Sequence, residues 1–599
     1  MRYSNEDDAS TSSRPSCENC GNQSAIYREL MDGVFCLSCY NQWAEKRMIE
    51  EPLPTVDELQ EFNPYPSFWP NQGETAIKII DSVRRNEKII GLSAPTASGK
   101  SGLLATVARW LIAHGFVDRV IYTTPQVKLV DFLAKSGWFK YYMQNDEGEK
   151  VLVNAYVVGR GNYPCAKYSN MQANCCVHRQ DSPPVCNPCE FNRDRMAYTE
   201  ANFALTTFDY FLSTHWRGST DRELLIVDES SDLEEMLLKH LSIKLDAARG
   251  RSNLDNPNVL DRFLLEWYVQ LQKQKEDLTV ELAPFKSKEK LNPDDEMELR
   301  RLSALKDDVE RNISKCERII GLLMHEYFID ENYNFRLLRG RAPFQRLVSK
   351  FSHVILASGT PTTSLLCEPQ EYTAIFMPHP IPVERRRVFY TPVASMTQKN
   401  RVNSAPFVAQ RILELHNKFH KHTLVHCHSY DVGKLLKKYM PQENVILQQS
   451  RAEDGYGREI YLDNWMKLPE GIFLCVKFNE GYNFEGPDYP LNIIAKVPFA
   501  SLEDIWQKRR MELDKSHFYN LNTAVYIEQA AGRCTRTPED YSETYIMDST
   551  FGWWYRKNKK LFEPWFQEAV AKFKKNGEYE QWPEVASSLL GIWSSANHL

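Results

Sequence analysis

The sequence contains no run of about 18 or more apolar residues, although 42% of its 599 residues are hydrophobic. A transmembrane helix needs about 20 consecutive apolar residues, so we expect no membrane-spanning helix. The first residues, MRYSNEDDASTSSRPSCENC, also lack the charged and then apolar order of a secretory signal. We therefore expect a soluble intracellular protein of the cytoplasm, nucleoid or nucleus that is not secreted.

A strongly basic charge balance is missing as well. The chain has 73 Lys and Arg against 79 Asp and Glu, which gives a formal net charge of -6. A nucleic-acid partner would therefore be held by local patches and not by the overall charge. The sequence shows no internal repeat, no low-complexity tract and no nuclease motif. At about 150 residues per domain, its length predicts about four structural units.

Cysteine is abundant, with 14 residues unevenly distributed along the chain. In a reducing compartment, clustered cysteines indicate metal binding more often than disulfides. Residues 17–39, CENCGNQSAIYRELMDGVFCLSC, hold two CxxC pairs. Each CxxC turn directs two sulfurs at one centre, and two such turns complete a tetrahedron. We therefore predict a zinc ribbon or knuckle, in which Zn²⁺ is held by Cys17, Cys20, Cys36 and Cys39.

A second cysteine cluster lies in residues 159–191, GRGNYPCAKYSNMQANCCVHRQDSPPVCNPCEF. Four thiolates suit an iron–sulfur cluster, and they also suit zinc. The residues alone leave both alternatives open.

Short strand-like apolar runs alternate with helical segments along most of the chain. This alternation predicts an α/β fold with parallel sheets and crossover helices. The runs form two sets, so we predict two α/β domains. The first set is KIIGLS, RVIYTT, VLVNAYVVG, FALTTF, ELLIVDE and HVILASG, and the second is HTLVHCHS, NVILQQ, GIFLCVKF, LNIIAKVPF and ETYIMDS.

Two further regions differ from these sets in composition. Residues 50–70, EEPLPTVDELQEFNPYPSFWP, are charged and contain several prolines, which predicts a linker. Residues 235–345 are charged and mostly helical in pattern, which predicts a helical insertion into the first α/β domain.

The octapeptide APTASGKS, residues 94–101, lies between a strand-like run and a helical segment, as a phosphate-binding loop requires. Gly99 lets backbone amides converge on phosphates, Lys100 supplies a positive charge, and the Ser101 hydroxyl can bind Mg²⁺. Asp228 and Glu229 end a later apolar run, where a magnesium-binding and a water-activating carboxylate are expected.

A third element is YIEQAAGRCTRTPEDY, residues 526–541. Gln529, Arg533 and Arg536 recur in it every three or four residues, which predicts that they share one helical face. Two arginines on one face could clamp a transferring phosphate.

The order of six segments closely resembles the XPD/DinG-like group of superfamily 2 helicases. These segments are APTASGKS, VDESSDLEEM, VILASGTPTT, FNEGYNFEG, KVPFASLEDIWQKRR and EQAAGRCTR. The resemblance covers roughly residues 65–565, and VPF-SLED ahead of Q-AGR--R is characteristic of this group. It implies two RecA-like domains with ATP bound between them, an iron–sulfur domain before the second Walker motif, and a helical Arch domain after it.

The resemblance also implies roles for single residues. Nucleotide and Mg²⁺ binding is implied for Gln72 on the adenine side, for Ala97, Ser98, Gly99, Lys100, Ser101 and Asp228, and for Glu480 and Gly481 of motif V. Catalytic roles are implied for Glu229 and for Gln529, Arg533 and Arg536 of motif VI, and a coupling role for Gly359 and Thr360.

With the resemblance, the second cysteine cluster is assigned to a 4Fe–4S cluster. Cys165 and Cys189 resemble the family's first and last ligands, and Cys186 is a third. The second ligand is Cys175 or Cys176, of which we favour Cys176, because adjacent residues rarely both reach one cluster.

The predicted organisation follows from these assignments. It comprises a zinc-ribbon-like module over residues 1–50, a first RecA-like domain over 51–234 with the iron–sulfur insertion at about 160–195, an Arch-like insertion over 235–345, a return to the first domain over 346–390, and a second RecA-like domain over 391–599.

The function implied by the resemblance is an ATP-dependent helicase or translocase that moves 5′ to 3′ on single-stranded DNA. Forked duplex is the expected substrate, and RNA is the alternative nucleic acid. Two departures from the family favour a second interpretation: Ser231 stands where DEAH has His, and Asn483 replaces an Asp of motif V. Both positions help to couple hydrolysis to movement. The alternative is therefore a nucleic-acid-stimulated ATPase that remodels protein–DNA complexes without strand separation.

A non-enzymatic recruitment protein with a degenerate ATPase fold is a further alternative. The intact Lys100, Asp228, Glu229, Arg533 and Arg536 argue against it.

Two aromatic and basic segments suit the stacking of single-stranded bases beside positive charge. They are FGWWYRKNKKLFEPWF, residues 551–566, and WQKRRMELDKSHFY, residues 506–519. For any single aromatic of these segments, packing in the protein core is the alternative.

Overall fold

The computed structural model describes most of residues 52–570 and a few positions before them. The gaps after residue 52 are 96–97, 136–139, 145–149, 153, 167–170, 176–188, 215–222, 246–253, 287, 289–290, 321–325, 361, 449–458, 477–483, 485–488, 536 and 538, and the described positions before it are 17, 20, 26–27, 34–35 and 39.

The chain forms two compact units. Unit 1 comprises Met1–Pro380 and Ala500–Tyr519, and unit 2 comprises Ile381–Phe499 and Asn520–Leu599. Each unit contains one large parallel sheet, so the predicted α/β class is confirmed. The sequence did not predict that Ala500–Tyr519 belongs to the unit formed by the first part of the chain.

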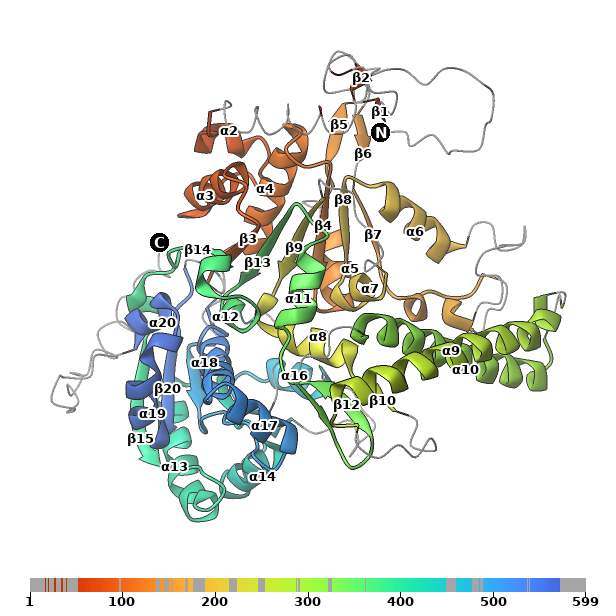
Figure 1. Ribbon diagram of the computed structural model, residues 1–599. Helices are drawn as coiled ribbons and strands as arrows, with labels where there is room; N and C mark the ends of the chain where they lie inside the picture. The colour runs from red at the N-terminus through yellow and green to blue at the C-terminus, as the bar shows by residue number, and fades with distance from the viewer. Residues whose placement is uncertain are drawn as a thin grey trace, which may run out of the picture. The chain divides into compact units, whose positions relative to one another are not determined.

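Unit 1 is built on a seven-stranded sheet in which all neighbouring strands are parallel (Figure 1). Its order is β14 (Thr373–Phe376), β3 (Ile89–Ser93), β13 (His353–Ser358), β9 (Glu223–Asp228), β4 (Arg119–Thr124), β8 (Phe203–Thr207) and β7 (Asn154–Val157). Every residue of β3, β8, β9 and β13 is buried. Parallel sheets are covered on both faces, which is why these strands read as nearly continuous apolar runs.

Helices of unit 1 pack around this sheet. Residues of α3 (Gln72–Arg84) and α4 (Lys100–Ala113) supply much of its hydrophobic core. The other helices beside the sheet are α5 (Val127–Lys135), α6 (Glu190–Glu200), α7 (Phe208–Thr214), α8 (Leu233–Leu241), α11 (Arg341–Val348) and α12 (Thr363–Leu366). Two small antiparallel pairs are β1 (Ile26–Tyr27) with β2 (Val34–Phe35), and β5 (Tyr142–Gln144) with β6 (Lys150–Leu152).

The residues before α3 are not a linker, so that prediction is wrong. Thr55 and Glu58 form a capping box that starts α2 (Val56–Gln60), and Leu59 is fully buried in the core of unit 1. The ring of Tyr65 lies against Gly102 of α4, where an added Cβ would come within 2.6 Å of it. The apolar residues between the prolines were the signal that the prediction overlooked.

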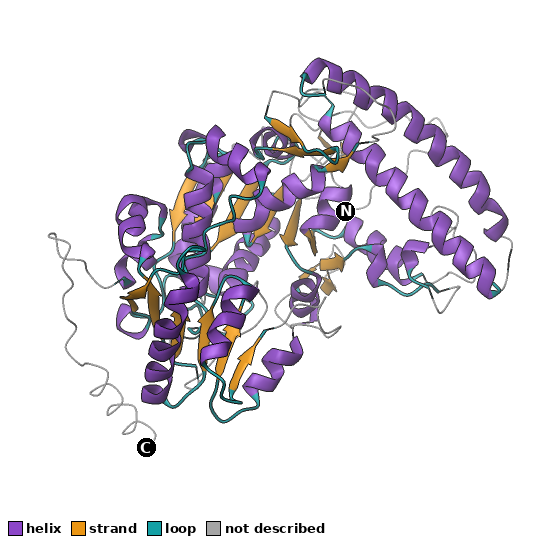
Figure 2. Ribbon diagram, turned by 90° about the horizontal axis from the view of Figure 1, so that it is seen from below, coloured by secondary structure: helices purple, strands orange, loops and turns teal. Residues whose placement is uncertain are grey.

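The charged region after α8 is mostly helical, as expected. The helices α9 (Pro257–Leu282) and α10 (Pro293–Ile319) lie side by side (Figures 1 and 2). Each begins at an asparagine that accepts a backbone hydrogen bond, followed by proline at the first helical position. The sequence did not predict the antiparallel sheet beside them, which has the order β10 (Ile243–Lys244), β12 (Asn334–Leu337) and β11 (Tyr327–Ile329).

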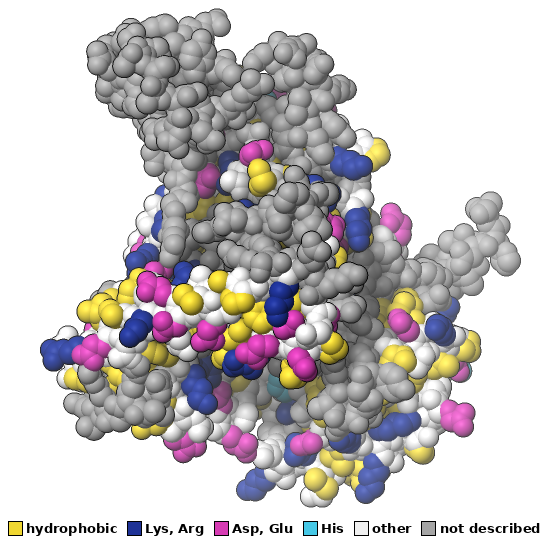
Figure 3. Space-filling model, turned by 90° about the vertical axis from the view of Figure 1, so that its right-hand side faces the viewer, with side chains coloured by type: hydrophobic (Ala, Val, Ile, Leu, Met, Phe, Trp, Pro, Cys, Tyr) yellow, Lys and Arg dark blue, Asp and Glu magenta, His cyan; other side chains and the backbone are white. Residues whose placement is uncertain are grey.

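The surface that carries the α9–α10 hairpin mixes apolar and charged side chains (Figure 3). Leu265, Val269 and Val280 of α9 are all more than half exposed. None of the described helices combines the length and the apolar composition that crossing a membrane would require.

Unit 2 is built on a six-stranded parallel sheet. Its order is β15 (Val388–Ala394), β20 (Glu543–Asp548), β19 (Leu491–Ile494), β16 (Thr423–His426), β18 (Ile472–Cys475) and β17 (Val445–Leu447). All five predicted runs of the second set form strands, and β15 is additional. The helices are α13 (Arg401–Phe419), α14 (Tyr430–Tyr439), α16 (Glu459–Met466), α19 (Thr550–Asn558) and α20 (Pro564–Ala569), together with most of α18 (His517–Ala531).

Candidate nucleotide site and nucleic-acid surface

The phosphate loop connects β3 to α4 at the carboxyl edge of the sheet in unit 1. Lys100 is the first residue of α4, and Gly99 before it has a φ of 66°, in the left-handed region that favours glycine. A Cβ at this position would also collide with the carboxamide of Gln72. The backbone thus has the strand, glycine turn and helix N-terminus that bind phosphates. Ser98 is buried in the loop, and Ala97 lies outside the described residues.

The side chain of Gln72 lies directly against this loop. Its Nε2 donates to the backbone oxygen of Ser98 at 2.9 Å and to that of Gly99 at 3.2 Å. Its Oε1 accepts from the backbone N–H of Trp69 at 2.8 Å, and the residue is 3% exposed. Gln72 therefore fixes the backbone of the phosphate loop, in addition to the adenine contact that the resemblance implies.

Lys100 is paired with both predicted Walker B carboxylates. Its Nζ lies 2.9 Å from Oδ1 of Asp228 and 2.8 Å from Oε1 of Glu229. Burial by itself would lower the pKa of Lys100, but these two carboxylates outweigh it, so the pKa is raised and the side chain stays cationic. The residues predicted from widely separated motifs are thus brought together at one sheet edge.

Asp228 accepts further hydrogen bonds that orient its carboxylate. Ser101 Oγ donates to its Oδ2 at 3.2 Å, and the hydroxyl of Tyr122 in β4 donates to the same oxygen at 2.6 Å. Burial together with Asp228 raises the pKa of Tyr122 well above its usual value, so the phenol remains a donor. A hydroxyl and a carboxylate side by side suit Mg²⁺. Sequence reasoning missed Tyr122, because nothing in RVIYTT marks one strand residue as functional.

Glu229 has an unusual backbone, with φ 54° and ψ 48°. A non-glycine residue in this region is strained, and such strain is concentrated at functional sites. The backbone N–H of Glu229 donates to Oδ1 of Asp228 at 2.9 Å, which helps to hold the conformation. Glu229 is also more exposed than Asp228, with side chains 31% and 2% accessible. This places the second carboxylate where it can meet water.

The predicted coupling motif lies close to the Walker B segment. Thr362 Oγ1 donates to the backbone oxygen of Ser231 at 3.2 Å, and the backbone N–H of Thr360 donates to Oγ of Ser358 at 3.1 Å. Gly359 and Thr360 follow β13, the strand between β3 and β9. The loop after β13 therefore contacts the backbone of the residue that replaces the family's histidine.

The predicted arginine face of motif VI is not a helical face. The helix α18 ends at Ala531, so Gln529 lies in its last turn while Arg533 lies in the turn beyond it. Gly532 follows the last helical residue, and glycine commonly ends helices. Arg533 is 6% exposed, and its positive charge, after burial, helps to lower the pKa of His426 to about 3. Arg536 and the motif V residues Glu480 and Gly481 lie outside the described residues.

A network of neutral side chains, called the neutral network below, joins β16, β18, β19 and β20 in unit 2. His426 Nε2 lies 3.1 Å from Oδ1 of Asn492, whose Nδ2 donates to the backbone oxygen of Ala530 at 2.7 Å and to Oγ1 of Thr544 at 3.1 Å. Cys475 Sγ lies 3.4 Å from Nδ1 of His426. These contacts connect the sheet to the last turn of α18.

Three of the four cysteines predicted to bind zinc come together. The Sγ atoms of Cys17, Cys20 and Cys39 lie within 4.8 Å of one another, and Cys36 lies outside the described residues. The β1–β2 hairpin lies between the two CxxC pairs. Three converging thiols on such a hairpin fit the donor set of a tetrahedral zinc site.

The described residues do not test the iron–sulfur prediction. Cys165 is buried and its backbone N–H donates to the oxygen of Met171, while Cys189 precedes α6 as its N-cap. Cys176 and Cys186 lie outside the described residues.

Most aromatic residues of the two candidate stacking segments are buried. Trp554, Tyr555, Phe562 and Phe566 belong to a hydrophobic core in unit 2, and Trp506 is 5% exposed. Packing is therefore the role of these aromatics, as the alternative stated. Trp553 differs from these residues, because it is 51% exposed with Lys557 Nζ 5.5 Å from its ring centroid.

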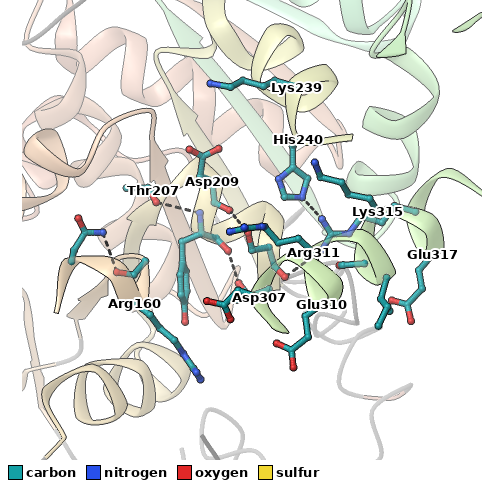
Figure 4. Close-up of a pocket in the computed structure, with 18 of the residues that line it drawn as sticks. Arg160, Thr207, Asp209, Lys239, His240, Asp307, Glu310, Arg311, Lys315 and Glu317 are labelled. Carbon is teal, nitrogen blue, oxygen red and sulfur yellow. Dashed lines mark hydrogen bonds between the residues drawn. The ribbon is translucent and has the colours of Figure 1, made fainter. Parts of the chain in front are cut away.

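A pocket of about 1170 Å³ lies in unit 1, between the cysteine-rich segment, α7, α8 and α10 (Figure 4). Eight of its lining residues are Lys or Arg, and four are Asp or Glu. Its aromatic wall includes Phe191, whose ring lies 4.8 Å from the guanidinium of Arg160. Burial and the charges of Arg318 and Lys315 lower the pKa of His240 to about 3. The pocket thus offers positive charge beside aromatic surface.

Comparison with known proteins agrees with this architecture. Residues 412–569 match the family of the helicase C-terminal domain. A solved XPD helicase is 14% identical with a TM-score of 0.52, covering 82% of this chain and 97% of that one.

Two further solved structures show the same level of similarity. An apo XPD is 15% identical with a TM-score of 0.48 (81% and 98% covered), and S. tokodaii Xpd4 is 13% identical with a TM-score of 0.48 (83% and 98% covered). No curated protein matches the sequence. The resemblance predicted from the motifs is thus confirmed: the chain has a fold similar to that of the solved XPD helicase, and residues 412–569 match the helicase C-terminal domain.

Proposed function

We propose that the protein is an ATP-dependent helicase that translocates 5′ to 3′ on single-stranded DNA. The observation that carries this proposal is that Lys100, which directly follows the left-handed Gly99 of the phosphate loop, forms ion pairs with both Asp228 and Glu229. These are the residues that phosphoryl transfer from a nucleotide to water requires.

Each residue has a distinct role in this proposal. Lys100 exchanges its carboxylate partners for the phosphate oxygens, which frees Asp228 and Glu229. Ser101 and Asp228 would hold Mg²⁺, which neutralises charge on the phosphates when it is bound. Tyr122 keeps Asp228 oriented through its hydrogen bond of 2.6 Å. Glu229, the more exposed carboxylate, orients the attacking water and accepts its proton.

Motif VI is proposed to supply the positive charge that stabilises the transition state. Arg533 and Arg536 are the two candidates, and Gln529 belongs to the same motif. Arg533→Ala and Arg536→Ala are each expected to reduce kcat by about 10³-fold with little effect on nucleotide affinity. A variant with unchanged kcat would assign that arginine to packing or to nucleic-acid binding.

The pocket of Figure 4 is proposed as part of the strand's path. Its excess of cations suits a phosphate backbone, and its aromatic surface suits unstacked bases. Arg195→Gln with Lys239→Gln is expected to weaken binding of oligo-dT and to reduce the salt dependence by about two charges. Lys288→Gln serves as the control, because Lys288 already pairs with Asp295 at 2.6 Å.

Two metal centres belong to the proposal. Zn²⁺ would be held by Cys17, Cys20, Cys36 and Cys39, and a 4Fe–4S cluster by Cys165, Cys176, Cys186 and Cys189. Anaerobically purified protein is expected to be yellow-brown, with about four irons and one zinc per chain. Cys189→Ser should bleach the colour, whereas Cys36→Ser should leave it unchanged. A colourless preparation with two zincs would contradict the iron–sulfur assignment and leave the ATPase assignment intact.

The decisive experiment combines hydrolysis with strand displacement. Single-stranded DNA is expected to stimulate ATP hydrolysis, and duplexes with a 5′ tail should be unwound faster than duplexes with a 3′ tail. Lys100→Ala is the inactive control. Stimulated hydrolysis without displacement of any substrate would instead support an ATPase that remodels protein–DNA complexes, which Ser231 and Asn483 favour. Absence of stimulation by DNA or RNA would contradict both.

A further inference from the structure

A buried ion pair joins the helix after the Walker B carboxylates to a segment from the second half of the chain. Glu234 lies in α8, and Arg510 lies in α17 (Ile505–Leu513). Nη2 of Arg510 lies 2.8 Å from Oε1 and 3.0 Å from Oε2 of Glu234. Both side chains are 2% exposed, and both belong to unit 1.

The carboxylate of Glu234 is also held from a second side. The backbone N–H of Gly340 donates to its Oε1 at 2.8 Å, and a Cβ at residue 340 would lie 2.7 Å from Cγ of Glu234. Burial raises the pKa of Glu234, while Arg510 and the N–H of Gly340 favour its ionised form. Such a buried charge is retained only with good partners, so the geometry of this pair is tightly specified.

Arg510 also organises the start of the next helix. Its Nε lies 3.3 Å from Oδ2 of Asp514, and the backbone N–H of Phe518 donates to the same oxygen at 3.1 Å. The guanidinium carbon lies 4.5 Å from the centroid of the Phe518 ring. Because α18 begins at His517, these contacts fix its first turn.

The helix α18 leads from this network to motif VI. Its residues up to Tyr519 belong to unit 1, and those from Asn520 onwards belong to unit 2. Gln529 lies in its last turn, and Arg533 follows directly after it. A continuous helix is stiff because each turn is hydrogen-bonded to the next, so a displacement of its first turn is carried along its axis.

The network is not saturated with hydrogen bonds. Nη1 of Arg510 and Oδ1 of Asp514 are buried and have no hydrogen-bond partner within the described part of the chain. Buried polar atoms without partners are costly and call for an explanation. A network that changes its partners during a reaction cycle would account for them.

We propose that Glu234 and Arg510 are positioning residues that couple ATP hydrolysis at Glu229 to motif VI through the first turn of α18. The inference rests on the proposed function, because the coupled movement is that of a nucleic-acid motor. In this proposal, the Glu234–Arg510 pair passes a movement of the segment that follows Glu229 to the first turn of α18. The pair itself neither binds nor cleaves ATP.

The test compares Arg510→Gln with Arg301→Gln. Arg301 lies in α10 and pairs with Glu298, its side chain is 56% exposed, and it serves as the control. ATP hydrolysis is measured with and without oligo-dT, together with duplex unwinding and thermal unfolding. Arg510→Gln is expected to keep basal hydrolysis within about threefold of the wild type and to lose at least about 10-fold in unwinding per ATP hydrolysed. Arg510→Lys should recover part of the loss, because it restores the charge without the two-pronged contact.

Asp514→Asn provides a second variant in case Arg510→Gln does not fold. It weakens the contact with Nε while leaving the Glu234–Arg510 pair, and a smaller loss of unwinding per ATP is expected. A fall of hydrolysis and unwinding by the same factor in both variants would overturn the inference and assign the network to stability alone. If oligo-dT does not stimulate ATP hydrolysis by the wild-type protein, the result would contradict the proposed function itself and not only this inference.

Discussion

The carboxyl edges of the two parallel sheets differ sharply in chemistry. In unit 1 this edge gathers Lys100, Asp228 and Glu229, and Lys100 Nζ lies 2.9 Å from Asp228 Oδ1 and 2.8 Å from Glu229 Oε1. In unit 2, His426 ends β16 and Cys475 ends β18; burial favours the neutral form of both, and the charge of Arg533 further lowers the pKa of His426. The strand ends of unit 1 thus carry a cluster of one lysine and two carboxylates, whereas His426 and Cys475 at the strand ends of unit 2 are neutral.

The difference teaches what the sheet itself contributes. Parallel strands deliver loops to a common edge, but the residues of those loops decide whether the edge binds an anion. Among the described residues, the edge in unit 1 alone combines a left-handed glycine, a lysine at a helix N-terminus and two carboxylates. The neutral network of unit 2 instead connects the sheet to the last turn of α18.

The largest expected effect breaks the charged edge. Lys100→Ala should abolish measurable ATP hydrolysis, because no backbone amide can replace the lysine's charge on the phosphates. Phosphate release measures the effect, and a thermal unfolding curve checks that the fold remains. Lys78→Ala on the exposed face of α3 is the control and should hydrolyse ATP normally. Turnover of Lys100→Ala within twofold of the wild type would contradict the assignment of the site.

The second prediction concerns the neutral network of unit 2. Asn492→Ala removes the donor to Ala530 and Thr544 and the acceptor beside His426, and these buried groups would be left unsatisfied. A loss of about 2–3 kcal/mol in the stability of unit 2 is expected. Hydrogen exchange of the amides in β16 and β19 reports this unit separately from unit 1. Asn417→Ala, on the exposed side of α13, is the control. Unchanged protection in Asn492→Ala would show that the network is dispensable.

The third prediction concerns the backbone of the charged edge. Gly99→Ala places a Cβ at a φ of 66° and against Gln72, which should cost about 1–2 kcal/mol and weaken nucleotide binding. Gly161→Ala is a matched control, because a Cβ there meets nothing within 4 Å. Titration of a fluorescent ATP analogue and thermal unfolding measure the two effects. Equal behaviour of the two variants would remove the argument that the loop requires glycine.

The smallest expected effect is a pH dependence of the stability of unit 2 that arises from His426 in the neutral network. The pKa of His426 in the folded protein, about 3, lies below the usual value of 6.5, so the unfolded chain binds a proton first as the pH falls. The contribution of neutral His426 to the free energy of unfolding is therefore fully present above pH 6.5, and it decreases as the pH falls from 6.5 towards 3. At pH 5.5 the decrease is about 1 kcal/mol. His426→Gln should show a correspondingly smaller loss of stability between pH 7.5 and 5.5. Parallel curves for the two proteins would contradict the shift.

The charged edge could be predicted from the sequence because its parts have local signals. The phosphate loop shows a strand, a glycine and a lysine before a helix, and the carboxylates show an apolar run that ends in Asp228 and Glu229. A parallel sheet then brings strand ends together whatever the intervening length, here with β13 between β3 and β9. No comparable local signal marks Tyr122. The resemblance implied Gln72 as an adenine contact, but its hydrogen bonds to the phosphate loop were not predicted, because they depend on which segments become neighbours.

Other residues were misjudged for reasons that the structure makes clear. The aromatic run after β20 was expected to bind bases, but a short amphipathic helix with the same composition packs its aromatics into a core and leaves Trp553 outside. The spacing of Gln529, Arg533 and Arg536 suggested one helical face, although Gly532 is a stop signal that could have limited the helix. Composition was given too much weight in the first case and periodicity in the second.

The assignment of Ala500–Tyr519 to unit 1 has a consequence for biosynthesis. Glu234 and Arg510 are 276 residues apart in sequence. At a synthesis rate of about 5–20 residues per second, Glu234 waits roughly 15–55 s on the ribosome before its partner has been made. All strands of the sheet in unit 1 have been synthesised before Arg510, so during that interval the carboxylate of Glu234 lacks its arginine partner. During synthesis, unit 1 therefore exists for a time without α17. In that state the carboxylate of Glu234, which is buried in the complete protein, is accessible to water or to a chaperone.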